Sequence, residues 1–365
     1  MQQKRIPILR AQARECLEGS AAMPADTVQF LGQTLRARPA GPAQTPTLFV
    51  VVDTEAEFDW FKPFARDMVK VRAMAAQQRA QAILDRYGIR PVYVIDYPVA
   101  SQPEGYMPLQ AILARGACEI GAHLHPWTNP PFDEPLGVVN SYPGNLPAGL
   151  EEAKFAVLLE AIQASFGLQP RFYKAGRYGI GPGTLAMLTR HGVGVDFSIL
   201  PGADMRAVGG PDFRALCPIP YETPDGRLTV MPMTRGHSGL LAAHDTALNA
   251  WLVGRIAQRL RLRGIFSRLG VLDRITLTPE GTSAGRLVAL LASLHRRGCR
   301  EFVMTWHSPS LVPGNTPYVR TEADLTGFLA RIETVCRYVV ESLGGRAGDP
   351  LALLPDQFRP VRNAS

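Results

Sequence analysis

Short apolar runs alternate along this chain with longer amphipathic segments. The runs have the length and composition of β-strands and lie at residues 47–53, 91–96, 118–125, 171–176, 194–200, 274–280 and 300–307. Most of the intervening segments have helical periodicity, and five of these end in the glycine that favours a helix C-terminus: Gly88, Gly116, Gly167, Gly192 and Gly298. Alternating strands and helices predict a parallel sheet with helices outside, and seven such units favour a closed or nearly closed barrel. A doubly wound open sheet is the alternative, but no GxGxxG follows the first strand.

The ends of the chain differ in character from this alternating region. Residues 24–46 are rich in Pro and Gly and have no clear periodicity. We therefore expect an irregular lead-in over residues 1–46, one barrel domain over residues 47–345, and a C-terminal tail over residues 346–365.

The composition is that of a globular protein, with 46% hydrophobic and 19% charged residues. The net charge of +7 is spread along the chain, except for a basic stretch at residues 254–270. That stretch predicts an amphipathic helix with a solvated basic face, and peripheral contact with an anionic lipid or glycan is the alternative. No nucleic-acid-binding motif accompanies it, so nucleic acid is not an expected partner.

Cysteine usage and hydropathy indicate the compartment. The five cysteines are odd in number, widely spaced and without a CxxC pair, which argues for reduced thiols over a disulfide framework. The first residues lack the apolar core of a signal peptide, and no run is long enough to span a membrane. We expect a cytoplasmic protein without a transmembrane segment.

Candidate chemistry lies where the predicted strands end. In a parallel barrel these ends meet on one face, where active sites form. Two long Pro- and Gly-rich segments, residues 126–150 and 201–226, follow strands on this face and predict a substrate cleft. The polar residues at or just past strand ends are Asp53, Asp96, His123, His125, Lys174, Arg177, Asp196 and His307.

The pair His123 and His125 has the spacing that places two side chains on one face of a strand. Such a pair either binds a metal or makes ordinary hydrogen bonds. Acidic residues follow the first strand in VVDTEAEFDW, and two histidines with one carboxylate form a catalytic zinc-type ligand set. An unpaired carboxylate at Asp53, beside a buried strand, would need compensation.

Five motifs, in order, resemble those of the nodulation-type polysaccharide deacetylases of carbohydrate esterase family 4, and more narrowly their divergent WalW-like branch. The resemblance spans about residues 47 to 320 and rests on VVDTEAEFDW, EIGAHLHPW, YKAGRYG, VDFS and TWHSPSL. It implies a distorted (β/α)7 barrel, a divalent metal, and hydrolysis of an N-acetyl or O-acetyl group on a sugar or glycan precursor.

The resemblance also implies roles for individual residues. Asp53 would be the general base and His307 the general acid. Glu55, His123 and His125 would bind the metal, although Asp53 and Glu55 could exchange roles because Thr54 separates them. The further residues with implied roles are Arg177 or Lys174, which would pair with Asp53, Asp196, which would orient its neighbours, and Tyr178, whose main-chain amide would help to hold the oxyanion.

Three questions stay open from the residues alone. Trp127 and Trp306 are candidates to stack on a sugar, with packing in the core as the alternative, and Lys174 is a further candidate substrate contact. The ligand set suits zinc, with cobalt, nickel and manganese as alternatives. A barrel that binds carbohydrate without turnover, or one that hydrolyses another non-peptide C–N bond, would carry similar motifs.

Overall fold

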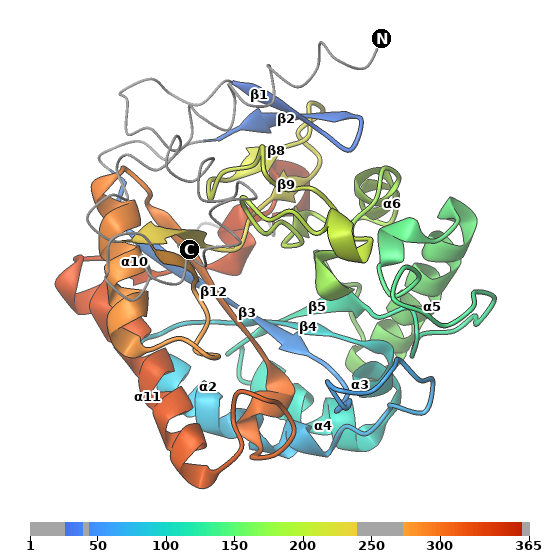
Figure 1. Cartoon of the computed structure of the whole chain (residues 1–365), viewed down its shortest axis with the longest axis horizontal. Helices are drawn as coiled ribbons and strands as arrows, with labels where there is room; N and C mark the ends of the chain where they lie inside the picture. The colour runs from blue at the N-terminus through green and yellow to red at the C-terminus, as the bar shows by residue number, and fades with distance from the viewer. Residues whose placement is uncertain (1–25, 39–43, 239–272, 360–365) are drawn as a thin grey trace, which may run out of the picture.

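A curved, mostly parallel β-sheet forms the centre of the protein, with helices packed around it (Figure 1). The computed structural model describes residues 26–38, 44–238 and 273–359. Six parallel strands form the sheet's main part in the order β7-β6-β5-β4-β3-β12. They are β3 (Thr47–Thr54), β4 (Val92–Ile95), β5 (Glu119–Leu124), β6 (Phe172–Ala175), β7 (Val195–Asp196) and β12 (Glu301–His307).

All seven predicted strands are confirmed, but the sixth, at residues 274–280, belongs to a second sheet. β11 (Asp273–Thr276) pairs antiparallel with β10 (Arg235–Ser238) and with no strand of the main sheet. Single hydrogen bonds connect the segment before β10 to both sides of the main sheet, from Met233 N to Ile199 O (2.9 Å) and from Thr234 N to Val303 O (3.3 Å). The structure is therefore a distorted (β/α)7-type barrel whose strand ladder does not close among the described residues.

The helices largely follow the predicted segments and surround the sheet (Figure 1). The segment ending at Gly88 forms a 3-10 helix (Arg72–Ala76) that is followed by a short α-helix. α5 ends at Gly167, which has a left-handed φ of 69°. The α-helices are α2 (Gln77–Arg86), α3 (Tyr97–Ser101), α4 (Pro103–Leu113), α5 (Ala148–Phe166), α6 (Thr184–Arg190), α10 (Ala284–Arg296) and α11 (Glu322–Arg337), of which α3 and α11 were not predicted.

Both predicted flanking segments contribute to the sheet. β1 (Thr27–Phe30) and β2 (Gln33–Ala37) form a hairpin where an irregular lead-in was expected. The hairpin extends the sheet through β8 (Tyr221–Glu222) and β9 (Thr229–Val230), which adjoins β7. β13 (Arg346–Ala347), in the predicted tail, pairs with β3.

Side chains on the strands alternate between two apolar layers. Phe49 and Val51 of β3 pack inside the barrel, whereas Leu48, Val50 and Val52 pack against the helices. Near the C-terminal ends of the strands, the side chains in the inward-facing positions therefore point into one end of the barrel. These residues are Asp53, Asp96, His123, Lys174 and His307.

Three further expectations concern the chain as a whole. No helix among the described residues is long and apolar enough to cross a membrane. Cys118, Cys299 and Cys336 are free thiols as predicted, whereas Cys217 is disulfide-bonded, which the sequence did not indicate. The basic stretch at residues 254–270 lies outside the described residues.

Candidate active site

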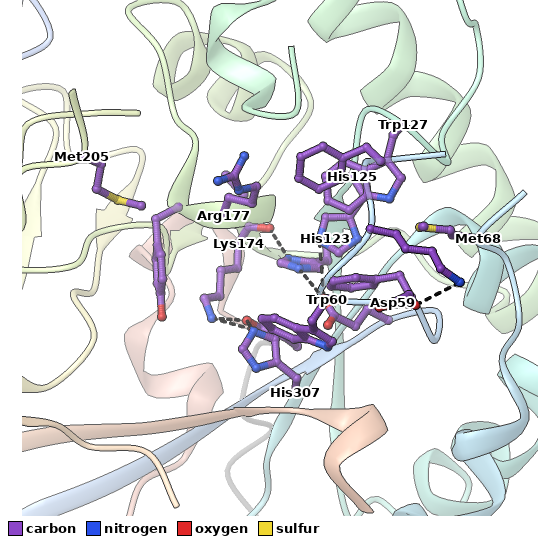
Figure 2. A pocket seen from close by; sticks show the side chains of 17 residues that line it. Asp59, Trp60, Met68, His123, His125, Trp127, Lys174, Arg177, Met205 and His307 are labelled. Atoms are coloured by element: carbon purple, nitrogen blue, oxygen red, sulfur yellow. Dashed lines mark hydrogen bonds and ion pairs between the residues drawn. The ribbon is translucent and has the colours of Figure 1, made fainter. Parts of the chain in front are cut away.

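Polar side chains from several strands meet at one end of the barrel around a cavity of about 370 Å³ (Figure 2). The strand register sets two of these meetings, since His307 on β12 lies opposite Asp53 on β3, and His123 on β5 lies opposite Lys174 on β6. The cavity is lined by all the predicted site residues except Asp196 and Trp306. Independent strands therefore bring these groups, apart from Asp196 and Trp306, to one end of the barrel.

A buried ion pair joins Asp53 to Lys174. The Lys174 Nζ lies 2.5 Å from both carboxylate oxygens of Asp53 and 3.2 Å from Thr305 Oγ1. Burial alone would raise the pKa of Asp53, but the Lys174 ammonium, with smaller contributions from His123 and His307, outweighs burial and holds the pKa below its ordinary value. Lys174 is only 1% exposed in this ion pair, so the structure places it as the partner of Asp53, and a contact with substrate stays a prediction.

His307 lies on the other side of Asp53, with its Nε2 3.7 Å from Asp53 Oδ2. Its Nδ1 lies 2.8 Å from Glu280 Oε2, and Glu280 Oε1 accepts hydrogen bonds from the His307 backbone N–H and from Ser310. Burial would lower the pKa of His307, but Glu280 and the other nearby carboxylates raise it to about 10. The ring is therefore a charged imidazolium at neutral pH, as a proton donor requires.

Glu55, His123 and His125 form a group that could hold a metal ion. Their candidate ligand atoms all lie within 4.8 Å of one another, and Glu55 Oε2 is 3.5 Å from His123 Nε2 and 3.4 Å from His125 Nε2. Glu55 Oε1 is buried without a hydrogen-bond partner among the described residues, and burial raises the pKa of this carboxyl. Burial also lowers the pKa of His125 to about 3, so its ring is neutral, as metal binding requires. This donor set fits a divalent cation such as zinc.

Buried acceptors fix the orientation of both imidazoles. His123 Nδ1 lies 2.7 Å from the Lys174 carbonyl oxygen, which leaves its Nε2 toward Glu55. His125 Nδ1 lies 3.4 Å from Asp96 Oδ2, which also accepts a hydrogen bond from the Ala56 backbone N–H. Asp96 is thus linked to one histidine and to the residue that follows Glu55, so it can align ligands from two strands.

Arg177 and Tyr178 follow β6 in a left-handed backbone conformation, with φ of 56° and 57°. Positive φ is uncommon for residues other than glycine, and it turns the chain sharply beside the cavity. The Tyr178 ring lies 4.8 Å from Lys174 Nζ, and both residues line the cavity. Arg177 makes no ion pair with Asp53, so the predicted choice between the two cations falls on Lys174. The oxyanion role of the Tyr178 amide stays a prediction.

Two predicted site residues lie elsewhere because of strand alternation. Trp306 precedes the inward-facing His307, so it points outward and packs against Phe328 of α11 at 1% exposure. Asp196 lies between the inward-facing Val195 and Phe197, and its carboxylate accepts hydrogen bonds from Ser198 instead of contacting a site residue. Trp306 is therefore not placed for sugar stacking, and within the described chain Asp196 makes no hydrogen bond to His307 or to another predicted site residue. Burial raises the pKa of Asp196 to about 7.

Aromatic rings cover much of the cavity wall. Trp127 is only 3% exposed and stacks on His125, with ring centroids 4.3 Å apart, so it supports that ligand. Trp60 is partly exposed and packs edge-on to His307 at 5.0 Å, and Phe58 stacks beside it. Trp60 is thus better placed than Trp127 to meet a sugar.

Two of these functional candidates, Glu280 and Trp60, were not named from the sequence. Both nevertheless lie within segments that the sequence singled out: Glu280 ends the predicted strand at residues 274–280, and Trp60 ends the acidic motif VVDTEAEFDW. The strand-end rule that selected Asp53 therefore also selects Glu280. No comparable rule points to Trp60, because the turn after Asp53 decides where its ring lies.

Comparisons with known proteins give likeness in structure only. No protein-family model and no curated protein matches the sequence. The chain is similar to a putative polysaccharide deacetylase from Mycobacterium smegmatis, with 15% identity, a TM-score of 0.44, and coverage of 86% of this chain and 99% of that one. It is also similar to a family 4 carbohydrate esterase from Streptomyces lividans, solved in complex with acetate, with 10% identity, a TM-score of 0.40, and coverage of 83% and 92%.

A third similar structure is described as a pseudoenzyme of the same esterase family, from Bacillus anthracis. It shares 8% identity at a TM-score of 0.41, over 87% of this chain and 69% of that chain. At these identities the likeness concerns the course of the chain alone.

Proposed function

We propose that the protein is a metal-dependent hydrolase that removes an acetyl group, preferably an N-acetyl group, from a sugar or glycan precursor. The observation that carries this proposal is the meeting, in one cavity, of the Glu55, His123 and His125 group with an ion-paired carboxylate and a charged histidine. The motif resemblance to family 4 esterases supports the choice of an acetyl group.

The protein's own groups divide the proton transfers of amide hydrolysis between them. Asp53 takes a proton from the attacking water, and Lys174 holds this carboxylate ionised and in position. His307, kept charged by Glu280, gives a proton to the departing nitrogen, so acetate and a free amine result. A divalent ion held by Glu55, His123 and His125 would supply Lewis-acid polarisation of the acetyl carbonyl.

The first experiment measures metal content and acetate release together. Protein loaded in turn with zinc, cobalt, nickel and manganese is analysed by mass spectrometry and incubated with a panel of N-acetylated and O-acetylated sugars. We expect about one metal per chain, lost in the variant His123→Ala/His125→Ala, and acetate release that Asp53→Asn abolishes. Stoichiometric metal without acetate from any sugar of the panel would contradict the proposal for those substrates.

One observation favours a second candidate, a carbohydrate-binding relative without turnover. Both carboxylate oxygens of Asp53 are engaged by Lys174, which weakens this group as a base. For such a protein, glycan binding would be saturable and unchanged by Asp53→Asn, and no acetate would appear. Measurable turnover by the wild type would exclude it. Hydrolysis of another non-peptide C–N bond uses the same groups and is separated by testing cyclic amides in the same assay.

A further inference from the structure

Arg177 is a cation of the cavity wall that the proposed chemistry leaves unused. Lys174 already compensates Asp53, and no carboxylate of the described residues lies within 4.0 Å of the Arg177 guanidinium. Arg177 is partly buried, and burial lowers its pKa. A guanidinium that has lost part of its hydration without gaining an anionic partner is unfavourable, and a bound anion would offset that loss.

The guanidinium is held in a fixed position. It packs over the ring of Tyr142 at 4.1 Å and lies 5.2 Å from the ring of Phe64. Its hydrogen bonds to Ser141 Oγ and the Val138 carbonyl both come from Nη1. The Nε and Nη2 groups therefore make no such bond within the described chain, and together they form the edge of a guanidinium that binds a carboxylate or phosphate in bidentate fashion.

The position of Arg177 is tied to the candidate metal group. A Cβ atom on the preceding Gly176 would lie 2.3 Å from His125 Cδ2, so this turn is pressed against the histidine. The left-handed φ of Arg177 then directs its side chain along the cavity wall, on the side of Met205 (Figure 2). Arg177 and His125 line the same cavity, so one small molecule can contact both residues.

The charge of the cavity also favours an anionic ligand. Its lining carboxylates are Asp53, Glu55 and Asp59, and they are matched by Lys62, Lys174 and Arg177, while the His307 imidazolium adds one positive charge that is paired with Glu280 outside the lining. A bound divalent cation would make the lining more strongly positive. A volume of about 370 Å³ is near the lower end of the range of about 300–1,000 Å³ for small-molecule sites, which suits one sugar unit.

We propose that Arg177 binds a carboxylate or phosphate group of the substrate, which makes that substrate an acidic acetylated sugar. This inference rests on the proposed function for the acetyl group, but the anion site itself can be tested by binding alone. The two sources of negative charge, a uronic acid and a sugar phosphate, share the chemistry that Arg177 recognises and are separated by the choice of ligand.

The test measures dissociation constants by calorimetry on zinc-loaded Asp53→Asn protein, which prevents turnover. The ligands are N-acetylglucosamine, its 1-phosphate and 6-phosphate, and N-acetylglucosaminuronic acid. We expect at least one acidic sugar to bind more tightly than the neutral one, and adding Arg177→Gln to weaken that binding by about ten- to a hundred-fold. Arg177→Lys, which keeps the charge without the bidentate edge, should lie in between. The matched control is Arg115→Gln, which removes an exposed arginine outside the cavity that pairs with Asp85, and which should change binding by less than about threefold.

Equal binding of neutral and acidic sugars, or no binding of any of them, would overturn the inference. An equal loss of affinity for neutral and acidic sugars in Arg177→Gln would also overturn it, because that pattern indicates that Arg177 only supports the 138–142 loop. Acetate release from neutral sugars alone would leave the proposed function standing and the acidic substrate refuted. Selective binding of acidic sugars without acetate release by the wild type would support the anion site and contradict the proposed hydrolysis.

Discussion

Replacing Lys174 by methionine tests whether the buried ion pair controls the ionisation of Asp53. Two unit charges 2.5 Å apart attract by roughly 7 kcal/mol at an effective dielectric constant of about 20, and the lost hydration of both ions offsets much of this. Removing one partner leaves the other buried and uncompensated, which typically costs about 3–5 kcal/mol. We expect Lys174→Met to lower the free energy of unfolding by that amount at neutral pH.

The pH dependence of this loss has a definite sign. In the wild type the pKa of Asp53 is lowered, so the stability that it contributes is present above its ordinary pKa of 3.8 and is lost as the pH falls through the lower folded value. In Lys174→Met burial, the largest influence on Asp53, raises its pKa, and the His307 imidazolium 3.7 Å away offsets only part of that rise, so protonation at mildly acidic pH relieves the poorly compensated charge. The stability difference between the two proteins should therefore shrink as the pH falls from about 7 to about 5.

Urea unfolding followed by tryptophan fluorescence, at both pH values, measures this difference. The double variant Lys174→Met/Asp53→Asn should recover most of the lost stability, because neither charge of the pair remains. Lys62→Met is the control, since it removes an exposed cation paired with Asp59 and should change stability little. A loss that is the same at both pH values and is not recovered in the double variant would refute the ion-pair explanation and indicate a packing defect instead.

Three further predictions concern the other groups of the site. Gly176→Ala should weaken zinc binding by about tenfold or more in a chelator competition, because its Cβ would clash with His125, whereas Gly149→Ala, where nothing lies within 4 Å, should not. Removing metal with EDTA should lower the melting temperature of the wild type by several degrees and that of Gly176→Ala by less, and equal shifts in both would argue against the clash. Glu280→Gln should lower the pKa of His307 from about 10 toward 6.5, so the alkaline limb of the pH–rate profile should move to lower pH, and an unchanged limb would exclude His307 as the acid.

Strand alternation made most of the candidate site predictable. The rule that His123 and His125 share one face of β5 also places Trp306 opposite to His307, and Asp196 opposite to its inward-facing neighbours. The periodicity that selected His123 and His125 as metal ligands therefore also argues against a role for Trp306 and Asp196 inside the site. Their place within the VDFS and TWHSPSL motifs was a weaker guide than the direction of their side chains.

The choice between Lys174 and Arg177 could not be made from the sequence. Lys174 lies on β6 with inner alternation, but Arg177 lies in a turn whose direction depends on a left-handed φ at a residue other than glycine. Closure of the barrel was equally hidden, because β7 is two residues long and single hydrogen bonds to residues 233 and 234 take the place of a continuous ladder. The hairpin of β1 and β2 did leave a signal, since Val28, Phe30 and Leu35 alternate with polar residues around a Leu-Gly turn.

That hairpin also covers one edge of the sheet. An unpaired strand offers a row of free N–H and C=O groups to any other chain, and a sheet edge left open is a common starting point for aggregation. β2 occupies the outer side of β8, and the strand at the margin is then β1, only four residues long. A chain trimmed to begin at the first strand of the predicted barrel, residue 47, would keep every group of the candidate site and yet expose β8. Such a trimmed protein would fail by self-association before its chemistry could be tested.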